Sequence, residues 1–282
     1  MIAYPLEVGT TVTRVIQSGL RGEPIVLIHG VGARADRWRR NVDPLAALGY
    51  RVYAIDLPGH GFAKKGKDFA YSIAGYAAFV EDFLEEIDAP RAVLIGTSLG
   101  GHIAAALACR RPELVRALVL VGSLGLLPVG AETRGRMRGG IVNTTREGIR
   151  QKLLRVNFDP ANVTEELVEE EYRVNNSPGA DDALTKLAEY FAERIDDDVV
   201  GQSLAALTPR LPTLLVWGAE ERSVAVSVGE TAASMLPAAR LVLLRDSAHG
   251  PYLEKAEAFN AVVGDFLAGA LGATKSPDIV YR

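Results

Sequence analysis

Residues 96–100 read Gly-Thr-Ser-Leu-Gly, a Gly-x-Ser-x-Gly pattern with Ser98 at its centre. The apolar run 92–95 before it predicts a buried strand, and the run 102–109 after it predicts a helix. A strand that turns directly into a helix holds the middle residue at strained backbone angles and projects its side chain from the sheet edge. Gly96 and Gly100 allow strand and helix to approach without a Cβ clash. Ser98 is therefore the candidate nucleophile at a nucleophile elbow.

A serine hydroxyl is a weak nucleophile without a general base. The base is sought among four histidines, namely His29, His60, His102 and His249. His249 follows the last expected core strand and precedes the last expected helix, so its loop can bring an imidazole onto the elbow. His102 starts the helix after Ser98 and is expected to point away from it. We therefore predict His249 as the base.

The base needs an acid that fixes its tautomer and stabilises the imidazolium. Glu220 and Glu221 both follow the expected strand 213–217, and either could face His249. Asp246, in the histidine loop itself, is the next candidate. The residues alone leave this choice open.

An acyl-transfer site also needs two N–H donors for the oxyanion. One is expected from Leu99, directly after the nucleophile at a helix N-terminus. The other is expected from the loop 29–32 after strand 25–28, where glycines let the backbone approach the substrate, and we choose the N–H of Val31.

The elements that must position these groups alternate along the chain. Apolar strand patterns alternate with amphipathic helices such as 73–87 and 256–267, which predicts an α/β fold with a mostly parallel sheet covered by helices on both faces. The expected strands are 11–17, 25–28, 52–55, 92–95, 117–121, 213–217 and 241–244.

Residues 126–206 break this alternation, because the segment is charged, helix-rich and without a convincing strand. Its expected helices are 146–156, 164–173, 181–194 and 197–207. An insertion after a central strand lies over the carboxyl edge of the sheet, where parallel sheets bind ligands. We therefore expect a core of residues 1–125 and 207–282 and a helical lid of residues 126–206. Residues 273–282 are expected to form a loose tail.

The chain as a whole resembles the α/β-hydrolase superfamily. The matching features span nearly the whole chain in the expected order: the His29-Gly30 loop, the run 56–61 (Asp-Leu-Pro-Gly-His-Gly), the elbow 96–100, Trp217-Gly218-x-x-Glu221 and the His249 loop. The resemblance implies the chain order Ser98, Glu221, His249 and favours Glu221 over Glu220, although aspartate is usual at that position. A serine at the elbow argues against haloalkane dehalogenases and epoxide hydrolases, which carry aspartate there.

The segment from Arg146 through Val168 resembles the lid of the meta-cleavage product hydrolases, which cut C–C bonds in ring-opened aromatic dienoates. Those enzymes carry an arginine where this chain has Glu171, and the chain also differs at Thr97 and Pro251. A carboxylate at 171 would repel a dienoate carboxylate. We therefore expect neutral esters to be preferred over anionic dienoates.

Three functions follow from these residues. The first expectation is a serine hydrolase that cleaves a carboxylic ester, lactone or thioester through an acyl-enzyme. The alternatives are a C–C bond hydrolase of 2-hydroxy-6-oxo-dienoates and a slow-turnover ligand receptor that keeps the hydrolase fold.

Composition limits the partners. The net charge is −4 with no basic block, which gives nucleic-acid binding no electrostatic support. No long apolar run predicts a membrane span and no signal peptide is evident, so we expect a cytoplasmic protein with a small-molecule substrate. The single cysteine, Cys109, is expected in the core, and no cofactor or metal is expected. A homo-oligomer remains open.

Overall fold

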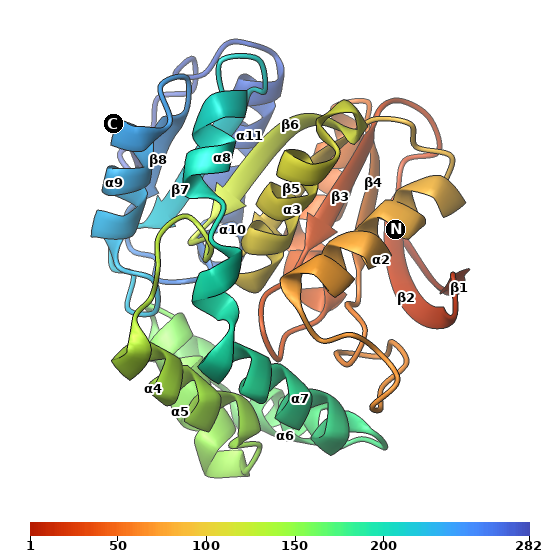
Figure 1. The fold of residues 1–282 in the computed structure, drawn as a ribbon. Helices are drawn as coiled ribbons and strands as arrows, with labels where there is room; N and C mark the ends of the chain where they lie inside the picture. The colour runs from red at the N-terminus through yellow and green to blue at the C-terminus, as the bar shows by residue number, and fades with distance from the viewer.

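The computed structural model describes residues 1–282, and it is built around one nine-stranded sheet in the order β1-β2-β4-β3-β5-β6-β7-β8-β9. The six central strands, in the order β4-β3-β5-β6-β7-β8, pair in parallel. The remaining pairs, β1–β2, β2–β4 and β8–β9, are antiparallel. The expected mostly parallel sheet is therefore confirmed (Figure 1). The strands are β1 (Ile2–Val8), β2 (Thr11–Ser18), β3 (Pro24–Ile28), β4 (Arg51–Ile55), β5 (Ala92–Thr97), β6 (Val115–Val121), β7 (Thr213–Gly218), β8 (Arg240–Leu244) and β9 (Ile279–Tyr281).

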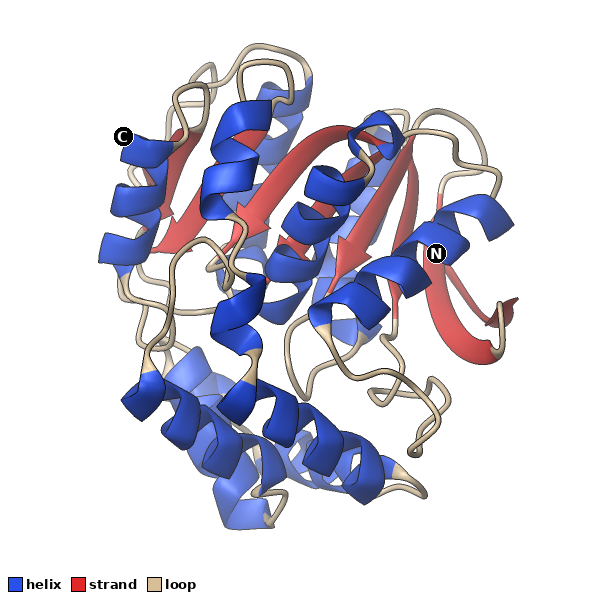
Figure 2. Cartoon of the chain, viewed as in Figure 1, coloured by secondary structure: helices blue, strands red, loops and turns tan.

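Helices cover both faces of this sheet, as Figure 2 shows. On one face α2, α3, α8 and α9 lie side by side, and on the other α1 packs with α10 and α11. The helices are α1 (Arg39–Ala47), α2 (Ile73–Glu86), α3 (Leu99–Arg110), α4 (Ala131–Val142), α5 (Arg146–Val156), α6 (Glu165–Asn175), α7 (Ala180–Glu193), α8 (Gly201–Leu207), α9 (Val226–Met235), α10 (Pro251–Glu254) and α11 (Ala256–Leu267).

Two hydrophobic cores result, because successive side chains of a strand point to opposite faces. In β3, Val26 and Ile28 belong to the core under α2 and α3, whereas Ile25 and Leu27 belong to the core under α1 and α11. All five residues of β3 are buried, as expected for a central strand covered on both sides. The sheet is thus held rigidly, and the loops at its carboxyl edge start from fixed positions.

Helices α4 to α7 form a separate layer across the carboxyl edge of the parallel strands, without any strand of its own (Figures 1 and 2). In that layer α4 packs against α7, and α5 packs against α6. The expected helical segment 126–206 is thus present, and it includes α4, which the sequence pattern did not indicate. Helix α8 lies partly within the same range but contacts α3 and α9, so it packs with the core. None of the helices combines the length and apolar character that a membrane span requires.

The two ends of the chain differ from the expectation. β1 was not predicted from the sequence, and the expected loose tail contains β9, which pairs antiparallel with β8 through Ile279 and Leu244. β1 is an edge strand with mostly exposed residues, so it lacks the apolar run that marks a core strand. β9 has only three residues and is defined by its pairing partner rather than by its own pattern.

Candidate active site

Ser98 lies at the turn between β5 and α3, with backbone angles φ 53° and ψ −116°. A non-glycine residue rarely adopts positive φ, and such strain concentrates at functional sites. The two flanking glycines are required by contact: a Cβ on Gly96 would lie 2.2 Å from the carbonyl oxygen of Gly100, and one on Gly100 would lie 2.3 Å from that of Ile28. The strand–turn–helix predicted for residues 92–109 is therefore present.

The loop after β3 lies beside Ser98. A Cβ built on Gly30 would lie 3.1 Å from the Ser98 Cβ, so only glycine fits there easily. The N–H of Val31 makes no hydrogen bond within the protein, and the N–H of Leu99, as first residue of α3, has no partner within its helix. The two chosen oxyanion donors thus flank the serine with unused N–H groups.

His249 and Glu221 are joined by a hydrogen bond of 2.6 Å between the imidazole Nδ1 and the carboxylate Oε2. The Glu221 side chain is completely buried and also accepts a 2.6 Å hydrogen bond from the N–H of Ser223. Burial raises the pKa of Glu221, but His249 and the backbone N–H groups of Ser223 and Val224 outweigh it and hold the pKa below its usual value. The carboxylate is therefore ionised at neutral pH and fixes the imidazole through Nδ1, leaving Nε2 free.

Glu220 has a different neighbour. Its carboxylate accepts a 3.1 Å hydrogen bond from the N–H of Ser247, and its own N–H donates to the Ser247 carbonyl. The Asp246 carboxylate faces Lys255 at 3.4 Å. Of the three candidate acids, only Glu221 contacts His249.

The other three histidines are buried and occupied elsewhere. His29 Nε2 accepts a 3.0 Å hydrogen bond from the N–H of Leu57, and His102 Nε2 lies 2.7 Å from the carbonyl of Asp198. Burial lowers the pKa of His29 to about 4 and that of His60 to about 3, so both are neutral at pH 7. Burial likewise raises the pKa of the Cys109 thiol to about 11, in keeping with a packing role.

A cavity of about 350 Å³ brings Ser98 and His249 together with the oxyanion loop. Its far wall comes from the α4–α7 layer, including Met137, Ile141 and Phe191. The layer also holds the histidine loop directly, because the carbonyl of Val156, at the end of α5, accepts a 3.1 Å hydrogen bond from the N–H of His249. Residues of the predicted site and of the predicted segment 126–206 therefore line the same cavity.

The cavity is cationic. It is lined by five basic side chains and by no acidic one; the basic ones are Arg37, Arg136, Lys152, Arg155 and Arg222. Three of them, Lys152, Arg155 and Arg222, form no ion pair. Lys152 donates a 3.0 Å hydrogen bond to the carbonyl of Val31, so a positive charge sits directly on the oxyanion loop. Burial lowers the pKa of Lys152 to about 8, although the nearby Glu171 carboxylate raises it.

Glu171 does not line this cavity, which corrects the expectation that its charge faces the substrate. Its buried carboxylate lies 2.9 Å from Arg34 and 3.3 Å from Arg37, and it accepts a hydrogen bond from Asn175. Arg34 is itself buried and also pairs with Glu170 at 2.7 Å. The negative charge at 171 is therefore neutralised inside an ion-pair cluster between α6 and the loop after β3.

Two positions with direct contacts to the site were missed from the sequence. Gly122, after β6, lies against the acid–base pair, because a Cβ there would be 3.0 Å from Glu221 Oε2 and 3.1 Å from His249 Nδ1. Gly122 directly follows an apolar strand, and this position in the sequence could have indicated that it lies at the carboxyl edge of the sheet, near the site. The contact between Lys152 and Val31 could not be predicted from a local pattern, because the two residues are 121 positions apart in the chain.

Comparisons with known proteins agree with this fold. Residues 23–256 match the family model described as alpha/beta hydrolase fold. The chain is 30% identical over 262 residues to the 2-hydroxy-6-oxononadienedioate/2-hydroxy-6-oxononatrienedioate hydrolase of Cupriavidus pinatubonensis, with 89% of this chain and 88% of the relative covered. It is 31% identical to the dihydrolipoyllysine-residue acetyltransferase component of the acetoin cleaving system of Cupriavidus necator, covering 91% of this chain but only 66% of that relative's length.

Among solved structures, the meta-cleavage product hydrolase of Pseudomonas fluorescens IP01 superposes with a TM-score of 0.82 at 24% identity, covering 95% of this chain and 98% of that one. The resemblances noted in the sequence are thus confirmed at the level of fold. The elbow, the sheet that carries it and the match over residues 23–256 together show that this chain belongs to the α/β-hydrolase family.

Proposed function

We propose that the protein is a serine hydrolase that cleaves the C–C bond of a ring-opened dienoate, a substrate bearing a carboxylate. The observation that carries this proposal is the cavity that holds Ser98 and His249 among five basic side chains, three of them without an ion pair, and no acidic one. The relatives named as hydrolases of 2-hydroxy-6-oxo dienedioates support it. This reverses the order expected from the sequence, which rested on a charge at Glu171 that is neutralised in the structure.

The triad in this proposal is Ser98, His249 and Glu221. His249 Nε2 takes the proton of the Ser98 hydroxyl as Oγ attacks the ketone carbon of the substrate. Glu221 holds Nδ1 and stabilises the imidazolium that forms. The N–H groups of Val31 and Leu99 stabilise the tetrahedral oxyanion.

The bond that breaks joins the former ketone carbon to the dienoate chain. In the keto tautomer of the substrate, its electron pair passes into the conjugated chain as a dienolate, which takes up a proton. An acyl-serine remains, and water attacks it with His249 again as the base. One water is consumed and two products are released, a carboxylic acid and a hydroxydienoate.

Recognition of the dienoate carboxylate falls to Lys152 and the neighbouring arginines in this proposal. Lys152 forms no ion pair and lies on the oxyanion loop, so a carboxylate beside it would gain a charge-assisted hydrogen bond. Such bonds contribute about 1.5–3 kcal/mol each.

Hydrolysis of a carboxylic ester is the second candidate. The sequence resemblance favours it, because the resembled C–C hydrolases carry an arginine at the position of Glu171, although Glu171 lies outside the cavity here. The same triad and oxyanion donors would serve it.

The test compares two substrates with one preparation. The dienoate 2-hydroxy-6-oxo-6-phenylhexa-2,4-dienoate is followed by loss of its absorbance, and 4-nitrophenyl butyrate by nitrophenol release. We expect kcat/KM for the dienoate to exceed that for the ester by at least about tenfold, or about 1.4 kcal/mol. The opposite ranking would replace the C–C proposal by the ester hydrolase. Binding of either compound without turnover would favour the receptor.

A further inference from the structure

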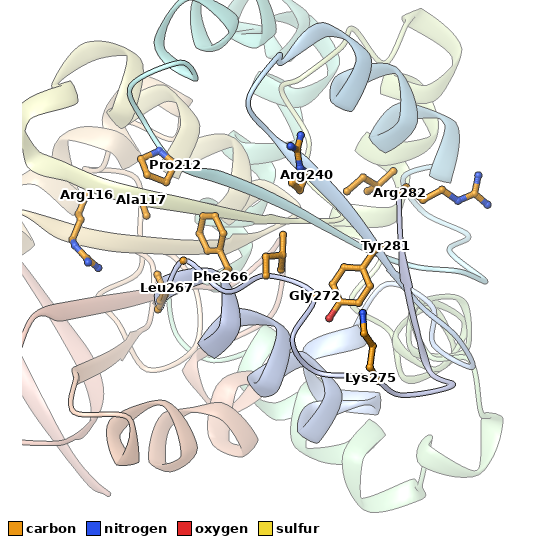
Figure 3. Close-up of a pocket in the computed structure, with 13 residues that line it drawn as sticks. Arg116, Ala117, Pro212, Arg240, Phe266, Leu267, Gly272, Lys275, Tyr281 and Arg282 are labelled. Carbon is orange, nitrogen blue, oxygen red and sulfur yellow. The ribbon is translucent and has the colours of Figure 1, made fainter.

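A second, larger cavity lies at the opposite edge of the sheet from Ser98. Its volume is about 830 Å³, against about 350 Å³ for the cavity with Ser98. It opens where β6, β7 and β8 begin, at residues 116–117, 212 and 240–241, whereas Ser98 follows the end of β5. The end of α11 and the C-terminal residues form its other walls (Figure 3). It therefore shares no wall with the catalytic cavity.

The floor of this cleft is apolar. In Figure 3, Phe266 and Tyr281 lie between Arg116 on the left and Arg282 on the right. Leu241, Leu267 and Leu271 are among the remaining lining residues. The position of Tyr281 is fixed, because β9 pairs with β8 and the Tyr281 hydroxyl donates a 3.0 Å hydrogen bond to the Thr274 carbonyl. The wall is thus a built part of the sheet and not a free tail.

The charged side chains around this floor have one sign. Four basic residues and no acidic one line the cleft, namely Arg116, Arg240, Lys275 and Arg282. Arg116 is paired with Glu23 and Arg282 with Glu230, both of which lie outside the lining. Arg240 and Lys275 have no side-chain carboxylate partner; Lys275 Nζ lies only above the Tyr281 ring, 5.8 Å from its centroid. Two cations beside an apolar floor are therefore available to a ligand.

From this arrangement we infer that the cleft binds an amphipathic carboxylate, whose apolar body covers Phe266 and Tyr281 while its head group meets Arg240 and Lys275. Apolar lining with a few convergent charged groups is the usual composition of small-molecule sites. A neutral amphiphile would leave both cations without a partner, and a small inorganic anion would leave the apolar floor exposed. An amphipathic carboxylate is complementary to both the apolar floor and the two cations, and this favours it over the other two classes of ligand.

The probe is decanoate, measured by isothermal titration calorimetry below its micelle concentration, with decanol and inorganic phosphate as comparisons. The protein is first treated with a long-chain phosphonylating reagent, whose adduct on Ser98 fills the cavity of about 350 Å³, so that decanoate cannot bind there. We expect decanoate to bind at one site, and at least about tenfold more tightly than decanol or phosphate.

The variants are the double substitution Arg240→Gln/Lys275→Gln and the control Arg21→Gln, an exposed arginine that lines neither cavity. The double variant should bind decanoate at least about tenfold more weakly, and the control should bind as the unmodified protein does. Hydrolytic turnover, measured on each variant before the phosphonylating treatment, should be unchanged, which also reports that the variants are folded.

Equal affinity in the double variant, or equal affinity for decanol and decanoate, would overturn the inference. So would binding to vesicles of phosphatidylglycerol without binding to monomeric decanoate, since that result would make the cleft a lipid-surface contact. Because Ser98 is blocked throughout and the cleft is remote from it, these outcomes are independent of which substrate the enzyme hydrolyses.

Discussion

Glu220 and Glu221 are consecutive in the chain, yet their carboxylates hold the histidine loop at different points. Glu221 Oε2 accepts a hydrogen bond of 2.6 Å from the His249 ring, whereas Glu220 Oε2 accepts one of 3.1 Å from the backbone N–H of Ser247. One carboxylate therefore orients the imidazole and the other braces the backbone that carries it.

The two glutamates can be separated by matched substitutions. Glu221→Gln should lower kcat by about 10³ to 10⁴, because an amide can hold the wrong tautomer and cannot stabilise the imidazolium. Glu220→Gln should leave kcat within a few-fold and cost about 1 kcal/mol of unfolding free energy. Steady-state kinetics and urea denaturation give both numbers. A reversed ranking would assign the acid to Glu220, and activity in both variants would point to Asp246.

Ser98→Ala should lower kcat by about 10⁴ or more, because the members of a triad act as a unit. The fold should be retained, and the variant should no longer be labelled by a fluorophosphonate. Ser123→Ala is the control, since Ser123 is buried close to the elbow but lines no part of the catalytic cavity. Near-normal turnover by the Ser98 variant would remove this residue from the mechanism.

The pKa of about 8 at Lys152 predicts a pH effect that depends on substrate charge. A lysine is charged below its pKa, so attraction for an anionic substrate should be present at pH 7 and decline as the pH rises through about 8. Lys152→Met should lower kcat/KM for the dienoate by about 10- to 100-fold at pH 7 and abolish this decline. Hydrolysis of a neutral ester should change little.

Lys186→Met serves as the control for that series, because Lys186 is exposed and lies outside the cavity. If the dienoate KM kept the same pH profile in Lys152→Met, another cation would be responsible for carboxylate binding.

Glu171→Arg should destabilise the protein rather than create a carboxylate site. The substitution places a third positive charge beside Arg34 and Arg37 and removes their shared buried partner. Breaking a buried ion pair in this way costs about 3–5 kcal/mol. Thermal and urea unfolding measure the loss, and Glu166→Arg, at an exposed position on the same helix, is the control. A stable Glu171→Arg variant with improved dienoate affinity would show that this side chain does reach the substrate.

Asp56 is a buried carboxylate that is joined to the same cluster through the ion pairs Asp56–Arg14, Arg14–Asp36 and Asp36–Arg34. Its carboxylate accepts hydrogen bonds from the N–H groups of Ala35 and Phe62, at 2.7 and 2.9 Å, and from the Arg14 guanidinium at 2.9 Å. Asp56→Asn should cost about 3–5 kcal/mol in urea denaturation, because Arg14 loses its fully buried carboxylate partner and keeps only Asp36. Asp182→Asn, on an exposed turn of α7, should change stability by less than about 0.5 kcal/mol. An equal effect of the two substitutions would contradict this role of Asp56.

The sequence alone was sufficient for the elements whose pattern is local. A buried strand followed directly by Gly-x-Ser-x-Gly and a helix favours a nucleophile elbow over an ordinary turn, and Ser98 has the strained backbone angles that this prediction requires. The parallel sheet followed from the alternation of apolar strands and helices, and the carboxyl ends of parallel strands necessarily meet at one edge. That is why residues as distant as Ser98 and His249 could be assigned to one site.

Only the tertiary structure decided what depends on long-range pairing. The three-residue strand β9 exists through its hydrogen bonds to β8, and its own residues carry no comparable signal. The resemblance favoured Glu221 over Glu220, and which of these two consecutive side chains contacts His249 was decided by the fold, which places Glu221 Oε2 2.6 Å from the imidazole Nδ1. Above all, the charge of the cavity depended on ion pairs such as Arg37–Glu171, between residues 134 positions apart. A side chain's charge is fixed by the sequence, but the partner that neutralises it is fixed by the fold.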